Sequence, residues 1–218
     1  MSNNDPHRGS PVEILGTPLS EAMGVVILLH GRGGSAGDIL SLAPSLNMHG
    51  LAFIAPEACG HIWYPLSFLA PRAENEPYLT SALRKIEAAV QTAIDAGISA
   101  DRIIVGGFSQ GACLATEFVA THPQRYAGLI AFTGGLIGPP GADLSHQGDL
   151  LATPALFASG DPDPHVPWQR VQQSADIIKA MGGVVTTRRY PGRGHTVTVE
   201  ELELAKELIA TSLQSKVA

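Results

Sequence analysis

The sequence predicts an α/β domain built on a doubly wound, mainly parallel sheet. Short apolar runs, each followed by turn residues, alternate with longer segments whose apolar residues recur at helical spacing. Runs that are apolar throughout are typical of strands buried on both faces of a parallel sheet. The 218 residues are enough for one such domain with a sizeable core. Residues 1–11 are polar and predict a flexible tail, which leaves residues 12–218 for a single domain.

Six segments have the character of strands. Five of them are short and apolar: 25–29, 51–55, 103–105, 128–132 and 155–159. The sixth, 184–190, is more polar, which indicates a strand nearer an edge of the sheet. Helices are predicted over 81–96, 109–121, 167–181 and 199–213. Ligands of such sheets bind beyond the carboxyl ends of the strands, so the residues that directly follow a strand are the candidates for function.

Composition and charge exclude several classes of protein. Hydrophobic residues make up 44% and charged residues 16% of the chain, which is typical of a globular protein, and the net charge of −6 argues against a nucleic-acid partner. The longest apolar run, 25–29, is too short to be an integral membrane segment. Residues 1–11 lack the apolar core of a secretory signal. Cys59 and Cys113 fit neither a metal site nor a disulfide framework, so we expect a cytoplasmic location and no bound metal.

Two long segments, 59–80 and 134–153, leave the carboxyl ends of predicted strands. Long loops of this kind are more often functional than simple spacers, although their apolar side chains could also pack over the sheet. The side chains that we expect to line a substrate pocket are Trp63, Tyr64, Phe68, Leu69, Leu136 and Ile137. No segment of helical length is left over to form a cap, so the pocket should be shallow.

The candidate nucleophile is Ser109, which lies in Gly107-Phe108-Ser109-Gln110-Gly111 and matches the G-x-S-x-G pattern. A predicted strand leads into this pattern and a predicted helix follows it. A tight, strained strand-to-helix turn needs small flanking residues, and it raises the serine hydroxyl above the edge of the sheet. The alternative is an ordinary serine that caps a helix among packing glycines.

A serine hydroxyl is a poor nucleophile at neutral pH and needs an adjacent base. The usual chain order in this type of sheet is serine, acid, histidine. The histidines after Ser109 are His122, His146, His165 and His195. Among them, His195 alone follows the end of a separate later strand and precedes the last helix, so we expect His195 to be the base; the alternative is a surface-loop histidine.

The acid should follow the preceding strand, 155–159, where Asp161 and Asp163 both occur. One of them can orient the histidine ring and stabilise its charged form. The other can brace the turn by accepting hydrogen bonds from nearby backbone N–H groups. Their positions in the sequence do not choose between these two roles.

The glycine-rich run His30-Gly31-Arg32-Gly33-Gly34-Ser35 follows the first apolar strand. Such a loop can present backbone N–H groups without obstruction by side chains. We expect an oxyanion hole made by the N–H groups of Arg32 and Gln110. A rival interpretation is a nucleotide-binding oxidoreductase, because residues 31–36 also fit G-x-G-x-x-G/A and Glu57 ends the next strand. That interpretation leaves Ser109, Asp163 and His195 unexplained.

Five ordered motifs together resemble the phospholipase/carboxylesterase family of α/β hydrolases, which includes acyl-protein thioesterases. They are HGRGG, WYP, GGFSQGA, SGDPDPHVP and GRGH, and the resemblance covers about residues 12–214. It implies an α/β-hydrolase fold without a large cap domain and without a cofactor, acting on carboxylic esters, some thioesters or lysophospholipids. Members of this family are often homodimers.

The resemblance also assigns roles to residues. It places the catalytic triad at Ser109, Asp163 and His195, and it supports the N–H of Arg32 as an oxyanion donor. Relatives that act on long acyl chains or on proteins tend to carry Leu at the position of Arg32 and Asp at that of Pro65. The departure at these two positions favours a carboxylesterase for small to medium esters over an acyl-protein thioesterase or lysophospholipase.

Three classes of function therefore remain in view. The first is a serine hydrolase that transfers the acyl group of a small-molecule ester to water. The second is the nucleotide-binding oxidoreductase. The third is a catalytically silent α/β-hydrolase scaffold, against which the complete set of candidate catalytic residues argues.

Overall fold

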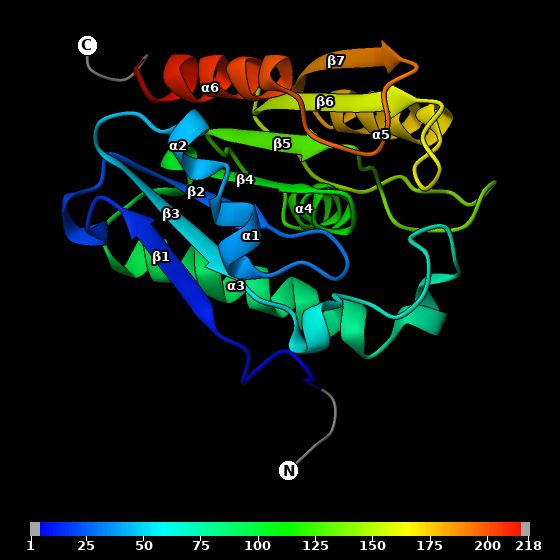
Figure 1. Ribbon diagram of the computed structural model, residues 1–218, viewed down its shortest axis with the longest axis horizontal. Helices are drawn as coiled ribbons and strands as arrows, with labels where there is room; N and C mark the ends of the chain where they lie inside the picture. The colour runs from blue at the N-terminus through cyan, green and yellow to red at the C-terminus, as the bar shows by residue number, and fades with distance from the viewer. Residues whose placement is uncertain (1–4, 215–218) are drawn as a thin grey trace.

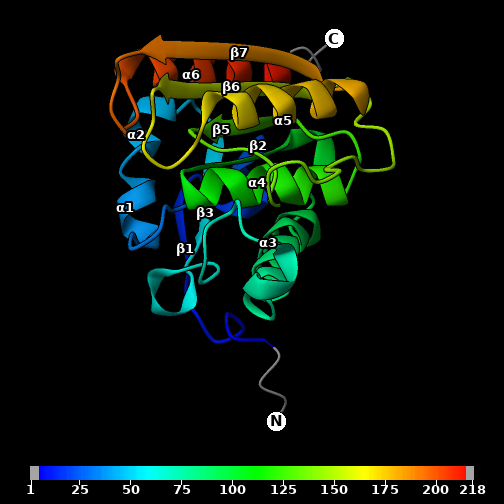
Figure 2. The same ribbon diagram turned by 90° about the vertical axis from the view of Figure 1, so that its right-hand side faces the viewer.

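A computed structural model describes residues 5–214 as one seven-stranded sheet with helices on both faces (Figures 1 and 2). The strands are β1 (Val12–Gly16), β2 (Gly24–Leu29), β3 (Leu51–Pro56), β4 (Ile103–Phe108), β5 (Gly128–Phe132), β6 (Pro154–Asp161) and β7 (Val184–Pro191). Their order across the sheet is β1-β3-β2-β4-β5-β6-β7. Strands β2 to β7 pair in parallel, and β1 pairs antiparallel to β3. The predicted doubly wound, mainly parallel sheet is confirmed.

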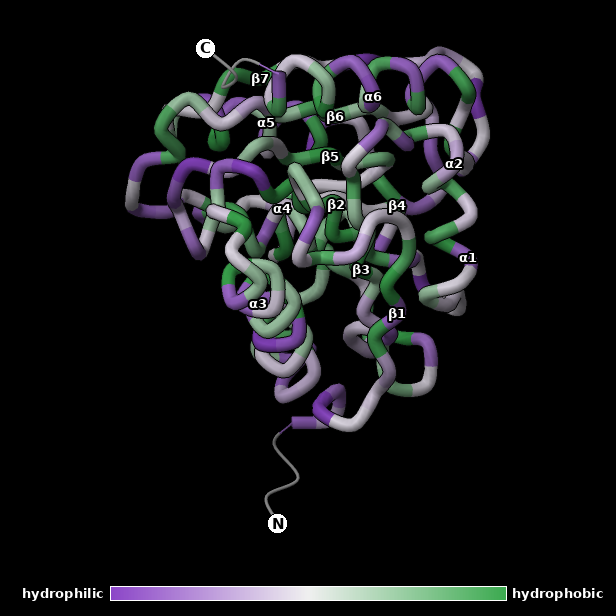
Figure 3. Tube along the Cα trace, turned by 90° about the vertical axis from the view of Figure 1, so that its left-hand side faces the viewer, coloured by the Kyte–Doolittle hydropathy of each residue, from purple (hydrophilic) through white to green (hydrophobic). Residues whose placement is uncertain are grey.

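Within residues 5–214 six α-helices accompany the sheet: α1 (Ala36–Leu40), α2 (Ala43–Leu46), α3 (Tyr78–Asp95), α4 (Gln110–Thr121), α5 (Trp168–Ala180) and α6 (Val199–Gln214). Helices α3, α4 and α5 pack on one face of the sheet, and α1, α2 and α6 pack on the other. Each face therefore has its own hydrophobic core, and the strands between them carry apolar side chains in both directions. In Figure 3 the tube shows hydrophobic residues in green and hydrophilic residues in purple. Strands β2 and β3 are buried along their whole length, as the continuous apolar runs predict.

All six predicted strands are present, and the more polar one, β7, lies at an edge of the sheet. Strand β1 was missed. Every residue of β1 is exposed, so the strand has neither an apolar run nor a buried face to reveal it in the sequence. The short helices α1 and α2 were missed as well, since five and four residues are too few to show helical periodicity.

The N-terminal segment differs from the expected flexible tail. Residues 5–11 lie within the described part of the chain, and the His7 side chain is completely buried. The backbone N–H of His7 donates to Ser81 Oγ at 2.9 Å, and Ser81 Oγ donates to Asp5 at 2.5 Å. These contacts join the segment to α3, so the expectation fails from residue 5 onward. The first four residues of the expected tail lie outside the described residues.

The register of the parallel strands determines where functional residues gather. Leu29 of β2 pairs with Gly107 of β4, and Phe108 of β4 pairs with Phe132 of β5. The carboxyl ends of the three central strands therefore meet at one edge, and the segments after them lie beside one another. Within residues 5–214, no helix is both long enough and apolar enough to cross a membrane.

Candidate active site

Ser109 forms a sharp turn between β4 and α4. Its backbone has φ 55° and ψ −117°, a conformation in the left-handed half of backbone space that side chains rarely adopt. Two hydrogen bonds hold it there: Ser109 N–H donates to the carbonyl oxygen of Phe132 at 2.9 Å, and Cys113 N–H donates to that of Ser109 at 3.0 Å. The strain is thus imposed by β5 on one side and by the first turn of α4 on the other.

The two glycines of the motif allow this turn to approach β2. A Cβ atom added to Gly107 would lie 2.6 Å from the carbonyl oxygen of Leu29, and one added to Gly111 would lie closer still to the same oxygen. The start of α4 therefore contacts the end of β2 backbone to backbone. This close approach gives the G-x-S-x-G pattern a packing reason, beyond the flexibility of glycine.

The structure brings Ser109, His195 and Asp163 into one hydrogen-bonded chain. His195 Nε2 lies 2.8 Å from Ser109 Oγ, and His195 Nδ1 lies 2.8 Å from Asp163 Oδ2. A carboxylate can only accept, so Nδ1 carries the ring proton and Nε2 is free to accept the proton of the serine hydroxyl. This is the geometry that a general base and its orienting acid require.

Asp163 is suited to remain charged in this chain. Its side chain is fully buried, and its Oδ1 accepts the backbone N–H groups of His165 and Val166, each at 2.9 Å. Burial raises the pKa of the carboxyl group, but the hydrogen bonds from His165, His195 and Val166 outweigh it and lower the pKa below its ordinary value. Asp161, the other candidate, forms an ion pair with Arg189 instead.

The glycine-rich loop after β2 lies against Ser109. A Cβ atom added to Gly31 would be 3.5 Å from the Cβ of Ser109. Gln110 is the first residue of α4, where backbone N–H groups have no acceptor within the helix and the helix dipole is positive. Within residues 5–214, neither the Arg32 nor the Gln110 backbone N–H has a hydrogen-bond acceptor. Both amides are thus available to a developing oxyanion.

The side chains of Arg32 and Gln110 have a different task, which the sequence did not reveal. The Arg32 guanidinium donates to three successive carbonyl oxygens, those of Tyr64 at 2.8 Å, Pro65 at 2.9 Å and Leu66 at 2.7 Å. The Gln110 side chain accepts Trp63 N–H at 3.0 Å and donates to the Tyr64 carbonyl at 2.8 Å. Both residues therefore hold loop 59–80 close to Ser109.

Two buried histidines also hold loop 59–80 in place. His30 stacks on Trp63 with ring centres 4.9 Å apart, and its Nε2 accepts the N–H of Ala58 at 3.1 Å. His7 donates through Nε2 to the Trp63 carbonyl at 2.9 Å and accepts Cys59 N–H through Nδ1 at 3.0 Å. Burial lowers the pKa of both rings, which keeps them neutral.

A cavity of about 650 Å³ opens above Ser109. Of the predicted pocket residues, Tyr64, Phe68 and Leu69 line it, together with Cys113 and His165, which were not predicted as pocket residues. His165 lies edge-on to His195, with ring centres 4.9 Å apart. Trp63 does not line the cavity, because its indole lies in the core and donates to the His30 carbonyl at 2.9 Å.

Leu136 and Ile137 do not line the cavity either, so their prediction as pocket residues is corrected. Both side chains are completely buried. Leu136 N–H donates to Ser174 Oγ at 2.8 Å, and Ile137 N–H donates to the carboxylate of Glu117 at 3.0 Å. These bonds hold loop 134–153 with its apolar side chains turned into the core.

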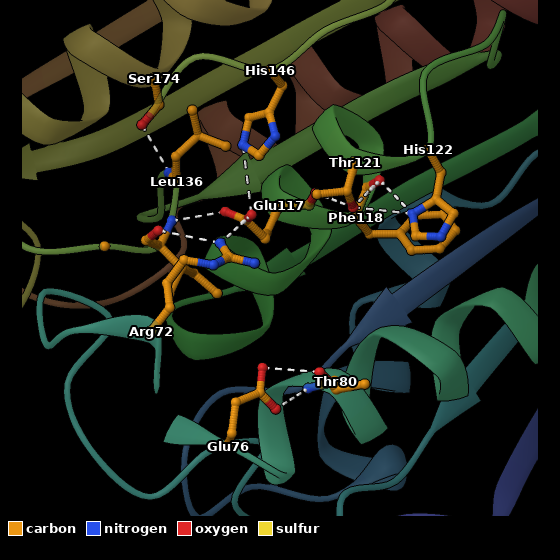
Figure 4. Close-up of polar contacts among 12 residues, drawn as sticks. Arg72, Glu76, Thr80, Glu117, Phe118, Thr121, His122, Leu136, His146 and Ser174 are labelled. Carbon is orange, nitrogen blue, oxygen red and sulfur yellow. Dashed lines mark hydrogen bonds and ion pairs between the residues drawn. The ribbon is translucent and has the colours of Figure 1, made fainter. Parts of the chain in front are cut away.

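Glu117 is a buried acidic residue that anchors this second loop (Figure 4). Its carboxylate forms an ion pair with Arg72 and lies 3.5 Å from His146 Nε2. The carboxylate comes from α4, Arg72 from loop 59–80 and His146 from loop 134–153. The one signal in the sequence was that Glu117 is the only charged residue of α4.

No group of three or more potential metal ligands occurs within residues 5–214. The glycine-rich loop also lacks the features of a dinucleotide site. The helix that follows it has only five residues, and the Glu57 carboxylate accepts Ala36 N–H at 3.0 Å instead of projecting freely. The oxidoreductase interpretation is therefore not supported.

A family model described as phospholipase/carboxylesterase matches residues 13–213. The chain belongs to this family. Among solved structures, the phospholipase/carboxylesterase from Dyadobacter fermentans is 43% identical, with a TM-score of 0.88 over 92% of this chain and 96% of that one. The Zea mays acyl-protein thioesterase 2 shares the fold at 21% identity, with a TM-score of 0.72 over 94% and 99% of the two chains.

Two fungal proteins are also similar to this chain. Acyl-protein thioesterase 1 of Saccharomyces cerevisiae is 30% identical over 90% of this chain and 96% of its own length. That of Neurospora crassa is 33% identical over 65% of this chain, and the match spans 59% of the fungal protein, which is less than two thirds of its length.

Proposed function

We propose that the protein is a serine carboxylesterase that hydrolyses small to medium carboxylic esters through an acyl-serine intermediate. The observation that supports this most strongly is the continuous hydrogen-bonded chain from Ser109 through His195 to Asp163 beneath an open cavity. Membership of the phospholipase/carboxylesterase family supports the same chemistry.

The proposed reaction has two halves. Ser109 Oγ attacks the ester carbonyl while His195 Nε2 takes the hydroxyl proton, and Asp163 stabilises the resulting imidazolium. The backbone N–H groups of Arg32 and Gln110 bind the oxyanion, and the imidazolium then gives its proton to the departing alcohol. In the second half a water molecule, activated by His195, attacks the acyl-enzyme and releases the acid.

The cavity supports the preference for small to medium acyl groups. Its apolar lining comes from segment 64–69, Phe108 and Val166 and lacks Leu136 and Ile137, which are turned into the core. Each methylene that is buried contributes about 0.8 kcal/mol, and the gain ends when the acyl chain outgrows the apolar wall. We expect kcat/KM to peak between about two and eight acyl carbons by this reasoning.

The names of the fungal relatives favour a second candidate, an acyl-protein thioesterase, with lysophospholipase activity as a related alternative. The two proposals differ in the acyl-chain length of the preferred substrate. A kcat/KM that rises continuously through palmitoyl p-nitrophenyl esters would favour the second candidate. A maximum at short or medium chains would favour the first.

The decisive test is a set of variants that separate the candidate catalytic residues from their neighbours. Ser109→Ala should fold normally, lose labelling by a fluorophosphonate and lose ester turnover by on the order of 10³ or more. Asp163→Asn should reduce kcat strongly, by up to about 10⁴ in the best-studied triad. Asp161→Asn is the matched control and should affect mainly the free energy of unfolding, by about 1 kcal/mol. Turnover near wild type in folded Ser109→Ala would reject Ser109 as the nucleophile and with it the acyl-serine intermediate.

We also propose a cytoplasmic location, because Cys59 and Cys113 fit no disulfide framework. The family resemblance makes a homodimer a candidate oligomeric state. Size-exclusion chromatography with light scattering measures the oligomeric state directly.

A further inference from the structure

A second cavity, of about 430 Å³, lies beside the first. Gly31, Arg32, Phe108 and His195 line both cavities, but the first also touches Ser109 and Gln110, whereas the second does not. The second cavity instead extends over α1 and along the segment that follows His195, where it meets Ile39 and Val197. The catalytic histidine thus stands between two cavities with different surroundings.

We propose that this second cavity binds the alcohol portion of the ester and that the preferred alcohol is uncharged and apolar. The inference rests on the proposed esterase function. The acyl carbon must bond to Ser109 Oγ, so the acyl chain belongs in the cavity that contains Ser109. The departing oxygen must receive its proton from His195 Nε2. The group attached to that oxygen therefore lies on the His195 side of the site, and the second cavity touches His195 while the Ser109 cavity is left to the acyl chain.

The lining of the second cavity indicates the class of alcohol. Ile39 is buried, and Leu42, Phe108 and Val197 are half-buried and pack on the core between the sheet and helices α1, α2 and α6. These four side chains form a continuous apolar wall. An alkyl or aryl group placed on it leaves water, which is the main source of favourable binding for such groups.

The polar groups around this wall are already engaged. The two ring nitrogens of His30 bond to Gly31 and Ala58, and the Arg32 guanidinium is taken up by three carbonyl oxygens. Asp38 accepts from Ser35 N–H at 2.9 Å and from Ser35 Oγ at 2.8 Å, and these bonds lower the pKa of its carboxyl group. An ionised carboxylate at the rim disfavours an alcohol that carries a negative charge.

The test varies the alcohol while the acyl group stays constant. Methyl, butyl and hexyl butyrates have primary leaving groups of similar basicity, so differences in kcat/KM report binding of the alcohol. We expect kcat/KM to rise by up to about fourfold per buried methylene, which corresponds to about 0.8 kcal/mol. An ester of a hydroxy acid with a free carboxylate should be poorer than the neutral ester of equal length.

Two matched variants test which of the two cavities produces the dependence of kcat/KM on the alcohol. Leu42→Trp fills the second cavity and should reduce the hexyl-to-methyl ratio of kcat/KM by at least about tenfold, while the dependence on acyl length stays unchanged. Leu69→Trp fills the first cavity and should change the acyl dependence alone. The hexyl-to-methyl ratio compares two substrates in one protein sample. A loss of folded protein therefore lowers both kcat/KM values equally and cancels in the ratio. If Leu42→Trp does not fold, Thr196→Trp fills the same cavity from an exposed position.

The failure of this inference is distinguishable from the failure of the proposed function. A wild-type protein that hydrolyses butyrate esters with no dependence on the alcohol overturns the assignment of the second cavity. A dependence that Leu42→Trp and Thr196→Trp leave intact, and that Leu69→Trp removes, also overturns it. Absence of any ester hydrolysis by the wild-type protein would instead reject the esterase function itself.

Discussion

Loops 59–80 and 134–153 both leave the carboxyl ends of sheet strands and both carry apolar residues, yet they face opposite ways. In the first loop Tyr64, Phe68 and Leu69 border the cavity above Ser109. In the second, Leu136 and Ile137 are completely buried beside α4 and α5. A loop's origin at the functional edge of a sheet therefore does not decide whether its side chains serve the site.

The partners of each loop's backbone explain the difference. The backbone of the first loop is held by the side chains of Arg32 and Gln110, which lie at the site, and by the side chain of His7. The second is held by buried polar side chains on the neighbouring helices, Glu117 of α4 and Arg170 of α5. Buried acceptors and donors must be satisfied, so the positions of these groups set the direction in which each loop turns.

Removing the anchor of the second loop should have the largest effect. Glu117→Ala leaves the buried N–H of Ile137 without its acceptor and opens a cavity, so the free energy of unfolding should fall by roughly 3 kcal/mol. Glu76 is the matched control, because its exposed carboxylate also makes two hydrogen bonds, both to Thr80 (Figure 4). Glu76→Ala should cost about 0.5 kcal/mol by denaturant unfolding. Equal losses in the two variants would contradict the role of Glu117.

A fall in pH should destabilise loop 59–80 more than loop 134–153. Burial lowers the pKa of His7 and His30 below the value of 6.5 expected in the unfolded chain. Below about pH 6.5 the unfolded chain therefore binds more protons than the folded one, and stability is lost as the pH falls toward the folded pKa values. Protonation of His7 Nδ1 also removes the acceptor of Cys59 N–H.

Hydrogen exchange at pH 7 and pH 5.5, corrected for intrinsic rates, measures this effect by segment. Protection should fall around residues 59–66 and change less around 134–138. His7→Gln removes one of the two titrating groups and should reduce the pH dependence of the free energy of unfolding. A pH dependence equal to that of the wild-type protein would exclude His7 as its source.

Loss of the Arg32 side chain should have the smallest effect on stability and a visible effect on catalysis. The guanidinium is exposed, so Arg32→Ala should lower the free energy of unfolding by less than about 1 kcal/mol. The carbonyls of Tyr64, Pro65 and Leu66 lose their common donor, and kcat/KM should fall by about tenfold as the acyl cavity widens. Arg32→Lys should restore little of the lost kcat/KM, because an ammonium group cannot reproduce the planar arrangement of N–H donors in a guanidinium. A loss limited to anionic substrates would instead assign Arg32 to substrate binding.

The sequence predicted most of the sheet and the three residues of the Ser109 chain, because those features depend on local patterns. Buried strands show as apolar runs, and a serine between two glycines shows as a motif. The residues alone left Asp161 and Asp163 as alternatives; the family spacing favoured Asp163, and the structure brings it to His195. The orientation of loop 134–153 depends on Glu117, which is at least 17 residues away in the chain, and no local pattern records that contact.

Strand β1 and residues 5–10 illustrate a second limit of sequence patterns. Exposed strands and short turns bury few apolar side chains, so their sequences resemble those of loops. His7 becomes structural only because a carbonyl of Trp63 and an N–H of Cys59 lie on either side of its ring. Such roles depend on contacts between distant segments.

The backbone-to-backbone contact between α4 and β2 has a consequence for how the molecule tolerates change. No side chain stands between Gly111 and Leu29, so there is no flexible group that could absorb a shift of either element. A substitution that moves the end of β2 would move the start of α4, and Ser109 with it, by a similar amount. A displacement of about 1 Å at a reacting group can cost on the order of 100-fold in rate. The end of β2 thus fixes the position of Ser109, and the packing of the core beneath β2 sets how precisely Ser109 is placed.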